Sequence, residues 1–380
     1  MSDRIVPQAF SPGEFIQDSL DARGWKQIDL ANIVGVAQSV VNNWVTGKRR
    51  ITAKTAQALA DAFGNDPEEW VKLQAVYDIT IRTLRRDDLR VKRSMLWHRV
   101  PMRHVIDRGW ILESENVETL EAEVLDFYKV KNIEDIKPKA YAARKSTDGS
   151  DLTNEQLAWY RRAKNIAECL PIQVKYKRST FQQLLDELEP LRIEPEEARK
   201  VPEVLRQHGI RFIVIEHLPG SKIDGICFWV GTKQDEPVIV LSMRYDRIDW
   251  FWFTLMHELA HVYHNHGKDH ASLDMSLVGA DAQPSAEKST EEKLADNFAS
   301  EYLIGQQDIE EFIGRISPLY SDTQIRGFAD SYNVHPGIVI GRLQLMNRIP
   351  YSRGRGMLVK IRECVIQSAL TDGWGNSIEI

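Results

Sequence analysis

The stretch HELAHVYHNH, residues 257–266, contains four of the chain's ten histidines and a glutamate. If this stretch is helical, His257 and His261 lie four residues apart and project from one face, close enough for both imidazoles to bind one zinc ion. Glu258 lies one residue further round the helix, where it can act as a general base toward a water molecule whose pKa the metal lowers. The spacing therefore predicts metal-dependent hydrolysis.

Two histidines alone hold zinc weakly, so a third protein ligand is expected. The segment STEEKLADNFASEYLIG, residues 289–305, places Glu292 and Asp296 on one face of a predicted helix. We expect Glu292 to bind the metal, Asp296 to orient a ligand histidine through its second ring nitrogen, and water to take the fourth position. Asp296 could instead be a solvated helix acid, and His264 and His266 are expected at the surface or as caps.

The elements around this motif must hold it rigidly. An apolar stripe of Leu255, Leu259 and Val262 can bury the helix, and Asp249 is expected to cap its N-terminus. Runs rich in β-branched and aromatic residues precede the helix and predict a small sheet with strands within 210–218, 225–231 and 237–244. An extended substrate could add a strand to this sheet and so place its carbonyl over the metal.

A second candidate site lies near the N-terminus, in WKQIDLANIVGVAQSVVNNWVTGKRRIT. Two helices, at about 27–33 and 37–45, flank Gly35, where left-handed backbone costs least. The exposed face of the second helix can read base edges in a major groove, and the basic residues after it can contact phosphates. The predicted DNA-binding residues are Gln38, Ser39, Asn42, Asn43, Lys48, Arg49 and Arg50. The alternative is that these helices form a scaffold or a protein-docking module.

The composition is that of a globular protein, with 43% hydrophobic and 27% charged residues and a net charge of −6. No apolar run approaches the roughly 20 residues that span a bilayer, and the N-terminus lacks the pattern of a signal peptide, so we expect a cytoplasmic protein with no membrane partner. The three cysteines are far apart and form no CxxC pair, which argues against a disulfide framework or a thiolate zinc site.

Changes of hydrophobic period along the chain predict an α+β fold that is mostly α. We expect a five-helix DNA-binding domain at 1–80, a helical connector at 81–200, a zincin-like domain at 201–345 with its small sheet packed on the HExxH helix, and a C-terminal tail at 346–380.

Residues 12–78 resemble the HigA-type antitoxins, a branch of the Cro and phage-repressor helix-turn-helix superfamily. The resemblance rests on PGE, on LANIVGV, on GKRRITAKTAQALADAFG and on WVKLQAVYD, which occur in this order. It implies sequence-specific binding to double-stranded operator DNA, usually as a homodimer on a palindrome.

Residues 200–345 are similar to the ImmA/IrrE family of zinc peptidases, through FWFTLMHELAHVYHNH followed by EEKLADNFASEYLIG. In this similarity Glu292 matches the ligand glutamate, and the family implies peptidases that cut DNA-binding repressors and so switch on stress, mobile-element or defence genes. We therefore expect a DNA-binding regulator whose zinc domain cleaves a repressor, a toxin or another copy of itself. The alternative is an antitoxin-like repressor whose zinc domain senses or binds a partner without proteolysis.

Overall fold

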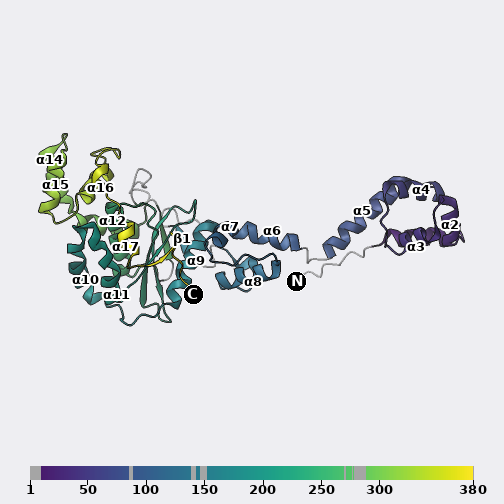
Figure 1. Cartoon of the computed structure of the whole chain (residues 1–380), viewed down its shortest axis with the longest axis horizontal. Helices are drawn as coiled ribbons and strands as arrows, with labels where there is room; N and C mark the ends of the chain where they lie inside the picture. The colour runs from purple at the N-terminus through teal and green to yellow at the C-terminus, as the bar shows by residue number, and fades with distance from the viewer. Residues whose placement is uncertain are drawn as a thin grey trace. The chain divides into compact units, whose positions relative to one another are not determined.

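The computed structural model of the chain describes residues 10–84, 89–137, 143–145, 152–268, 271–275, 277 and 288–379. The chain divides into two compact units, Met1–Arg93 and Ser94–Ile380, whose elements are labelled in Figure 1. The four-part division expected from the sequence stays a prediction. The elements of its connector and its tail contribute to the core and the sheet of the second unit.

The first unit contains five helices around one small core. Its helices are α1 (Pro12–Asp21), α2 (Gln27–Val34), α3 (Gln38–Val45), α4 (Ala53–Phe63) and α5 (Pro67–Leu84). Leu30, Val41 and Trp44 are buried in this core. Gly35 closes α2 in the left-handed conformation, with φ at 69°. The two helices and the glycine turn predicted for a helix-turn-helix are confirmed to within one residue.

The second unit contains most of the helices and the sheet. After α6 (Leu89–Arg99), which crosses the division between the units, the helices are α7 (Met102–Asp107), α8 (Val117–Tyr128), α9 (Asn154–Cys169), α10 (Phe181–Leu188), α11 (Val201–Gln207), α12 (Ile248–His264), α13 (Thr290–Leu303), α14 (Gln306–Ile316), α15 (Asp322–Ser331), α16 (Pro336–Leu345) and α17 (Arg362–Ile366). The HExxH motif thus lies on a helix, as predicted.

The sheet of the second unit has six strands in the order β1-β5-β3-β4-β2-β6. The strands are β1 (Ala143–Lys145), β2 (Arg211–Ile215), β3 (Ile223–Val230), β4 (Glu236–Leu241), β5 (Ala271–Met275) and β6 (Leu370–Asp372). The three predicted strands are confirmed as β2, β3 and β4. The prediction that a peptide could add to this part of the sheet is wrong for the sheet as it stands, because β5 already pairs with β3 and β6 already pairs with β2.

The sheet separates two cores, because successive side chains on a strand point to opposite faces. On β2, Phe212 and Val214 belong to the core that contains α12, whereas Ile213 and Ile215 belong to the core that contains α8 and α9. Figure 1 shows α12 and α9 on either side of the strands. The predicted packing of the sheet on the HExxH helix is confirmed.

Every residue of α12 from Ile248 to Val262 is buried. The prediction that Asp249 caps this helix is wrong by two residues, because Arg247 is the N-cap residue and Asp249 lies in the first turn. The Asp249 carboxylate pairs with Arg247 at 2.7 Å and packs on Gly341 of α16, where an added Cβ would lie 2.4 Å from Asp249 Oδ2. The carboxylate therefore contributes to the joint between α12 and α16.

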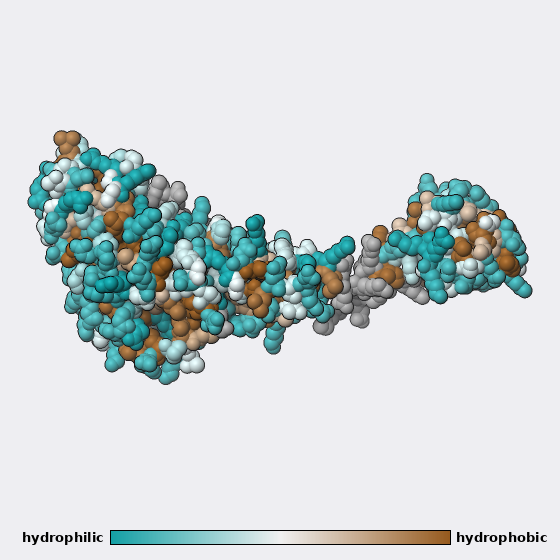
Figure 2. All heavy atoms as spheres, viewed as in Figure 1, coloured by the Kyte–Doolittle hydropathy of each residue, from teal (hydrophilic) through white to brown (hydrophobic). Residues whose placement is uncertain are grey.

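The second unit also contains a buried ion pair that ties α9 to β6. Arg162 lies 2.5 Å from Asp372, and both side chains are almost fully buried. Among the described residues no helix has both the length and the apolar composition needed to cross a membrane. Figure 2 shows hydrophilic residues predominating on the visible face of each unit, with hydrophobic residues in smaller groups between them.

Candidate metal centre and nucleic-acid interface

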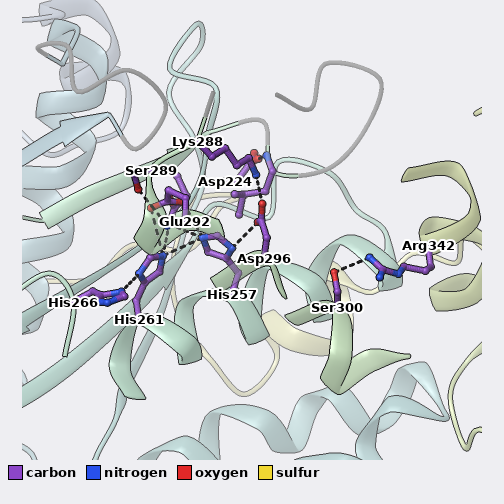
Figure 3. A network of polar contacts seen from close by, with 12 residues as sticks. Asp224, His257, His261, His266, Lys288, Ser289, Glu292, Asp296, Ser300 and Arg342 are labelled. Carbon is purple, nitrogen blue, oxygen red and sulfur yellow. Dashed lines mark hydrogen bonds and ion pairs between the residues drawn. The ribbon is translucent and has the colours of Figure 1, made fainter. Parts of the chain in front are cut away.

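The three predicted metal ligands, His257, His261 and Glu292, lie together between α12 and α13 (Figure 3). The Nε2 atoms of His257 and His261 are 3.1 Å apart. Glu292 Oε2 lies 3.2 Å from Nε2 of His257, and Glu292 Oε1 lies 3.6 Å from Nε2 of His261. The four-residue spacing of the histidines on α12 and the position of Glu292 in the first turn of α13 bring these donors together.

A fourth donor, Asp274 of β5, was not predicted. Its Oδ2 atom lies 3.6 Å from Nε2 of His257 and 3.9 Å from Nε2 of His261. The antiparallel pairing of β5 with β3 sets Asp274 opposite Gly225. Because this position depends on strand pairing rather than on local spacing, no signal in the sequence singled out Asp274.

The donor set fits a zinc ion. One donor atom from each of His257, His261, Asp274 and Glu292 can be chosen so that all lie within 4.8 Å of one another. Zinc bonds of 2.0–2.2 Å in a tetrahedron place neighbouring donors roughly 3.3–3.6 Å apart, close to the separations found here. No nitrogen or hydroxyl donor of the described residues makes a hydrogen bond to the buried carboxylate oxygens of Asp274. A buried carboxylate without such a donor is costly, and a cation would compensate it.

Each histidine has a partner at its second ring nitrogen. Asp296 Oδ1 lies 3.1 Å from Nδ1 of His257, and Lys288 Nζ lies 2.6 Å from Asp296 Oδ2. Nδ1 of His261 lies 3.0 Å from Nδ1 of His266. If Nδ1 of each ligand histidine carries the proton toward these partners, Nε2 is left free to bind a metal.

The two histidines outside the donor set differ. His264 is exposed, as predicted. His266 is half-buried, so the expectation of a surface or capping residue overlooked its contact with His261. The backbone N–H of His266 donates to the carbonyl oxygen of His261, and the Trp229 indole N–H donates to the carbonyl oxygen of His266. These bonds hold His266 behind the ring of His261.

The buried charges shift the pKa of each group. Burial lowers the pKa of His257, but the carboxylates of Asp274, Asp296 and Glu292 outweigh it and leave the pKa raised. Burial and the neighbouring His257 lower the pKa of His261 to about 3. Burial raises the pKa of Glu292, and the charge of Asp274 raises it further. The carboxylates that raise the pKa of His257, and the Asp274 charge that raises the pKa of Glu292, concentrate negative charge where a cation would be stabilised.

Glu258 faces the sheet beside this donor set. An added Cβ at Gly225 would lie 2.3 Å from Glu258 Oε1, so glycine is required for α12 to lie this close to β3. Burial, followed by the charge of Asp274, raises the pKa of the Glu258 carboxyl. No nitrogen or hydroxyl donor of the described residues makes a hydrogen bond to either of its oxygens. Glu258 is thus placed to exchange a proton with a molecule bound at the centre.

The predicted DNA-binding residues lie on α3 and the turn after it. Gln38, Ser39 and Asn42 are exposed and Asn43 is half-buried, while Val41 and Trp44 on the opposite side enter the core. The three basic residues of the GKRR turn, Lys48, Arg49 and Arg50, are exposed as well. The Arg50 guanidinium pairs with Asp78 of α5, so it is partly neutralised within the unit.

Two family models match separate parts of the chain. A helix-turn-helix model matches residues 16–70, which include α2 and α3. The peptidase M78 model, described as an IrrE N-terminal-like domain, matches residues 205–344, which include β2 to β5 and both helices of the candidate centre.

The curated relatives match less than a fifth of the chain. Virulence-associated protein A' of Dichelobacter nodosus is 40% identical over 70 residues, which are 18% of this chain and 61% of that protein, less than two thirds of its length. The helix-turn-helix-type transcriptional regulator YddM of Escherichia coli K12, itself uncharacterized, is 31% identical over 68 residues, 18% of this chain and 72% of that protein. A solved HigA-family addiction module antidote protein from Coxiella burnetii is 29% identical, with a TM-score of 0.21, and covers 25% of this chain and 97% of that one.

Proposed function

We propose that the second unit of this chain uses zinc to cut a peptide bond in a protein partner. The chain belongs to the helix-turn-helix transcriptional regulators and carries an IrrE N-terminal-like domain. One observation carries the proposal. His257, His261 and Glu292 form a set of donors at zinc spacing, and the carboxylate of Glu258 lies beside them without a hydrogen-bond donor.

In the proposed hydrolysis, different residues of the chain have different roles. His257, His261 and Glu292 would hold the ion, while Asp296 and His266 keep the two rings oriented. Zinc at such a site supplies Lewis acidity, which polarises a carbonyl and lowers the pKa of water towards neutrality. Glu258 takes a proton from the attacking water and returns it to the amine that leaves, so that one water is consumed for each peptide bond cut.

The first unit would place this activity at an operator. Gln38, Ser39, Asn42 and Asn43 would face base edges in the major groove, and Lys48 and Arg49 would contact phosphates. Half-sites on a palindrome require two copies, so we infer a homodimer on double-stranded DNA. Cleavage of a repressor, a toxin or another copy of the chain would then change expression irreversibly.

A second candidate function is binding without proteolysis, in which the zinc domain senses a signal or holds a partner. The burial of the centre favours it, because His257 and Glu258 are 0% exposed and a peptide cannot reach them in this arrangement. Fully enclosed zinc sites are commonly structural. The two functions share the metal ligands and differ in the role of Glu258.

The variant Glu258→Gln separates them. Zinc content would be measured on the purified protein, and the product of the adjacent gene and a second copy of the chain would be offered as substrates, with new termini mapped by mass spectrometry. We expect zinc-dependent cleavage that Glu258→Gln abolishes while zinc content and operator binding are kept. Cleavage by Glu258→Gln at the wild-type rate would remove Glu258 from the mechanism, and the absence of stoichiometric zinc would overturn the proposed function.

A further inference from the structure

β5 lies over the metal-binding histidines, where an extended substrate would be expected. It pairs antiparallel with β3, and the pairs Ile226–Leu273 and Cys227–Ser272 continue the register beyond Asp274. In the described sheet β4 pairs with one edge of β3, and β5 occupies the other edge. Extended peptides recognise sheets by adding to such an edge, so β5 and an added substrate strand compete for one position.

The carboxylate of Asp274 occupies the centre of this overlap. Its Oδ2 atom lies 3.6 Å from Nε2 of His257 and 3.9 Å from Nε2 of His261, and neither of its carboxylate oxygens has a hydrogen-bond partner among the described residues. The side chain is 0% exposed. Glu258, the proposed base, interacts with the same carboxylate. Asp274 therefore lies beside the metal-binding rings and interacts with the base, so it takes up space that a nucleophilic water and a substrate carbonyl would need.

The chain just after β5 is anchored to Asp224 of β3, which Arg244 contacts in turn. The backbone N–H of Leu277, two residues beyond the strand, donates to Asp224 Oδ2 at 2.8 Å. Arg244 lies 3.0 Å from Asp224 Oδ1. The carboxylate of Asp224 is fully buried, and its burial raises its pKa to about 7 even though Arg244 opposes the shift. The buried carboxylate of Asp224 thus anchors the chain just after Asp274.

We propose that Asp274 is the fourth protein ligand of the metal and keeps the peptidase centre closed, so that hydrolysis requires Asp274 and β5 to leave. This rests on the proposed function, since it concerns the zinc site of that function. Four protein ligands complete a tetrahedral sphere, whereas catalytic zinc sites keep one position open. Release of Asp274 opens that position, frees the space beside Glu258 and exposes the edge of β3 in a single event.

Cobalt substitution tests the ligand count directly, because Co²⁺ has visible absorption bands that respond to a new ligand and azide is a small probe for an open position. The proteins compared are the wild type, Asp274→Ala, the isosteric Asp274→Asn, and Asp249→Asn as a control at another buried aspartate, which lies on α12. Azide should leave the spectra of the wild type and Asp249→Asn unchanged at concentrations that shift the spectrum of Asp274→Ala.

Zinc affinity gives a second readout that is independent of catalysis. By competition with a chelator, both Asp274 variants should bind zinc at least about tenfold more weakly than the wild type, because even the loss of an outer partner costs that much. Asp249→Asn should match the wild type. If Asp274→Ala is too unstable to purify, Asp274→Asn keeps the shape of the side chain and carries the same comparison.

The outcomes separate this proposal from the function on which it rests. The role of Asp274 is overturned if the Asp274 variants bind stoichiometric zinc with unchanged affinity and azide shifts the cobalt spectrum of the wild type. The peptidase site would then be open in the wild type. A wild type that binds no zinc overturns the proposed function itself. Faster cleavage of the adjacent gene product by Asp274→Ala than by the wild type, lost in the double variant with Glu258→Gln, would support both.

Discussion

Replacement of Asp296 by asparagine should weaken zinc binding about tenfold. Asp296 Oδ1 lies 3.1 Å from Nδ1 of His257, and a proton held between these atoms would orient the ring so that Nε2 faces the other donors. A hydrogen bond to a charged group contributes about 1.5–3 kcal/mol and one between neutral groups about 0.5–1.5 kcal/mol, so the amide forfeits about 1–1.5 kcal/mol. That difference is about tenfold in a dissociation constant. Asp296→Ala loses the whole bond and should approach a 100-fold loss.

The assay is a competition between apoprotein and a chromogenic chelator at pH 7, with circular dichroism to check the fold. Lys288→Met is the matched control, because Lys288 Nζ lies 2.6 Å from the other oxygen of Asp296 but contacts no metal ligand. Its zinc affinity should stay within about threefold of the wild type, a change of less than about 0.7 kcal/mol. An Asp296→Asn protein that binds zinc as tightly as the wild type would refute the view that this carboxylate orients His257.

Three other perturbations test separate parts of the molecule. In calorimetry, zinc at a thousandfold excess over its dissociation constant should raise the Tm of the second unit by about 7 °C and leave the Tm of the first unit unchanged. Equal Tm shifts in both units would contradict the assignment of the site to the second unit. Burial lowers the pKa of His335, whose neutral Nδ1 accepts a hydrogen bond from the backbone N–H of Gly337 at the start of α16. The stabilisation that His335 gives the folded protein is therefore complete above about pH 6.5 and is lost as the pH falls through the lower folded pKa. In urea titrations His335→Asn should flatten this loss of stability, whereas His335→Ala should cost about 1 kcal/mol of stability at pH 7.5. In fluorescence anisotropy, Gln38→Ala and Asn42→Ala should each cost about 1–3 kcal/mol on the operator but little on random DNA, whereas Lys48→Ala and Arg49→Ala should weaken both and lower the salt slope by about one each.

Local spacing was sufficient to predict the parts of the centre that lie on helices. His257 and His261 share a face of α12, and Glu292 and Asp296 share a face of α13, because residues four apart on any helix do so. The start of α12 was misplaced by two residues because Asp249 has a better partner in Arg247 than in the backbone N–H groups of the helix. Side-chain pairing of this kind cannot be inferred from the list of residues that favour caps.

Residues that reach the centre through tertiary structure could not be predicted in the same way. Asp274 is a single acid in a five-residue strand, and only its register with β3 brings it opposite Gly225 and over the histidines. His266 follows α12 at no ligand spacing, and the left-handed turn at Asn265 directs it back to His261. The strands β1 and β6 have three residues each, too few for a recognisable period, since alternation needs about four residues to be detected.

In the proposed site, the balance of charge would favour a metal ion together with Asp274. Two neutral imidazoles, the carboxylates of Glu292 and Asp274, and a divalent cation sum to zero net charge, which is the arrangement that a water-excluded core tolerates best. Withdrawal of Asp274 leaves one positive charge at the metal, and a nearby anion must replace the lost carboxylate. Glu258 is a carboxylate that remains against the sheet beside the centre, while azide supplies the charge from solution. The Asp274→Ala centre should therefore bind azide more tightly than uncharged imidazole of similar reach, and the opposite order would show that the fourth position is not controlled by charge.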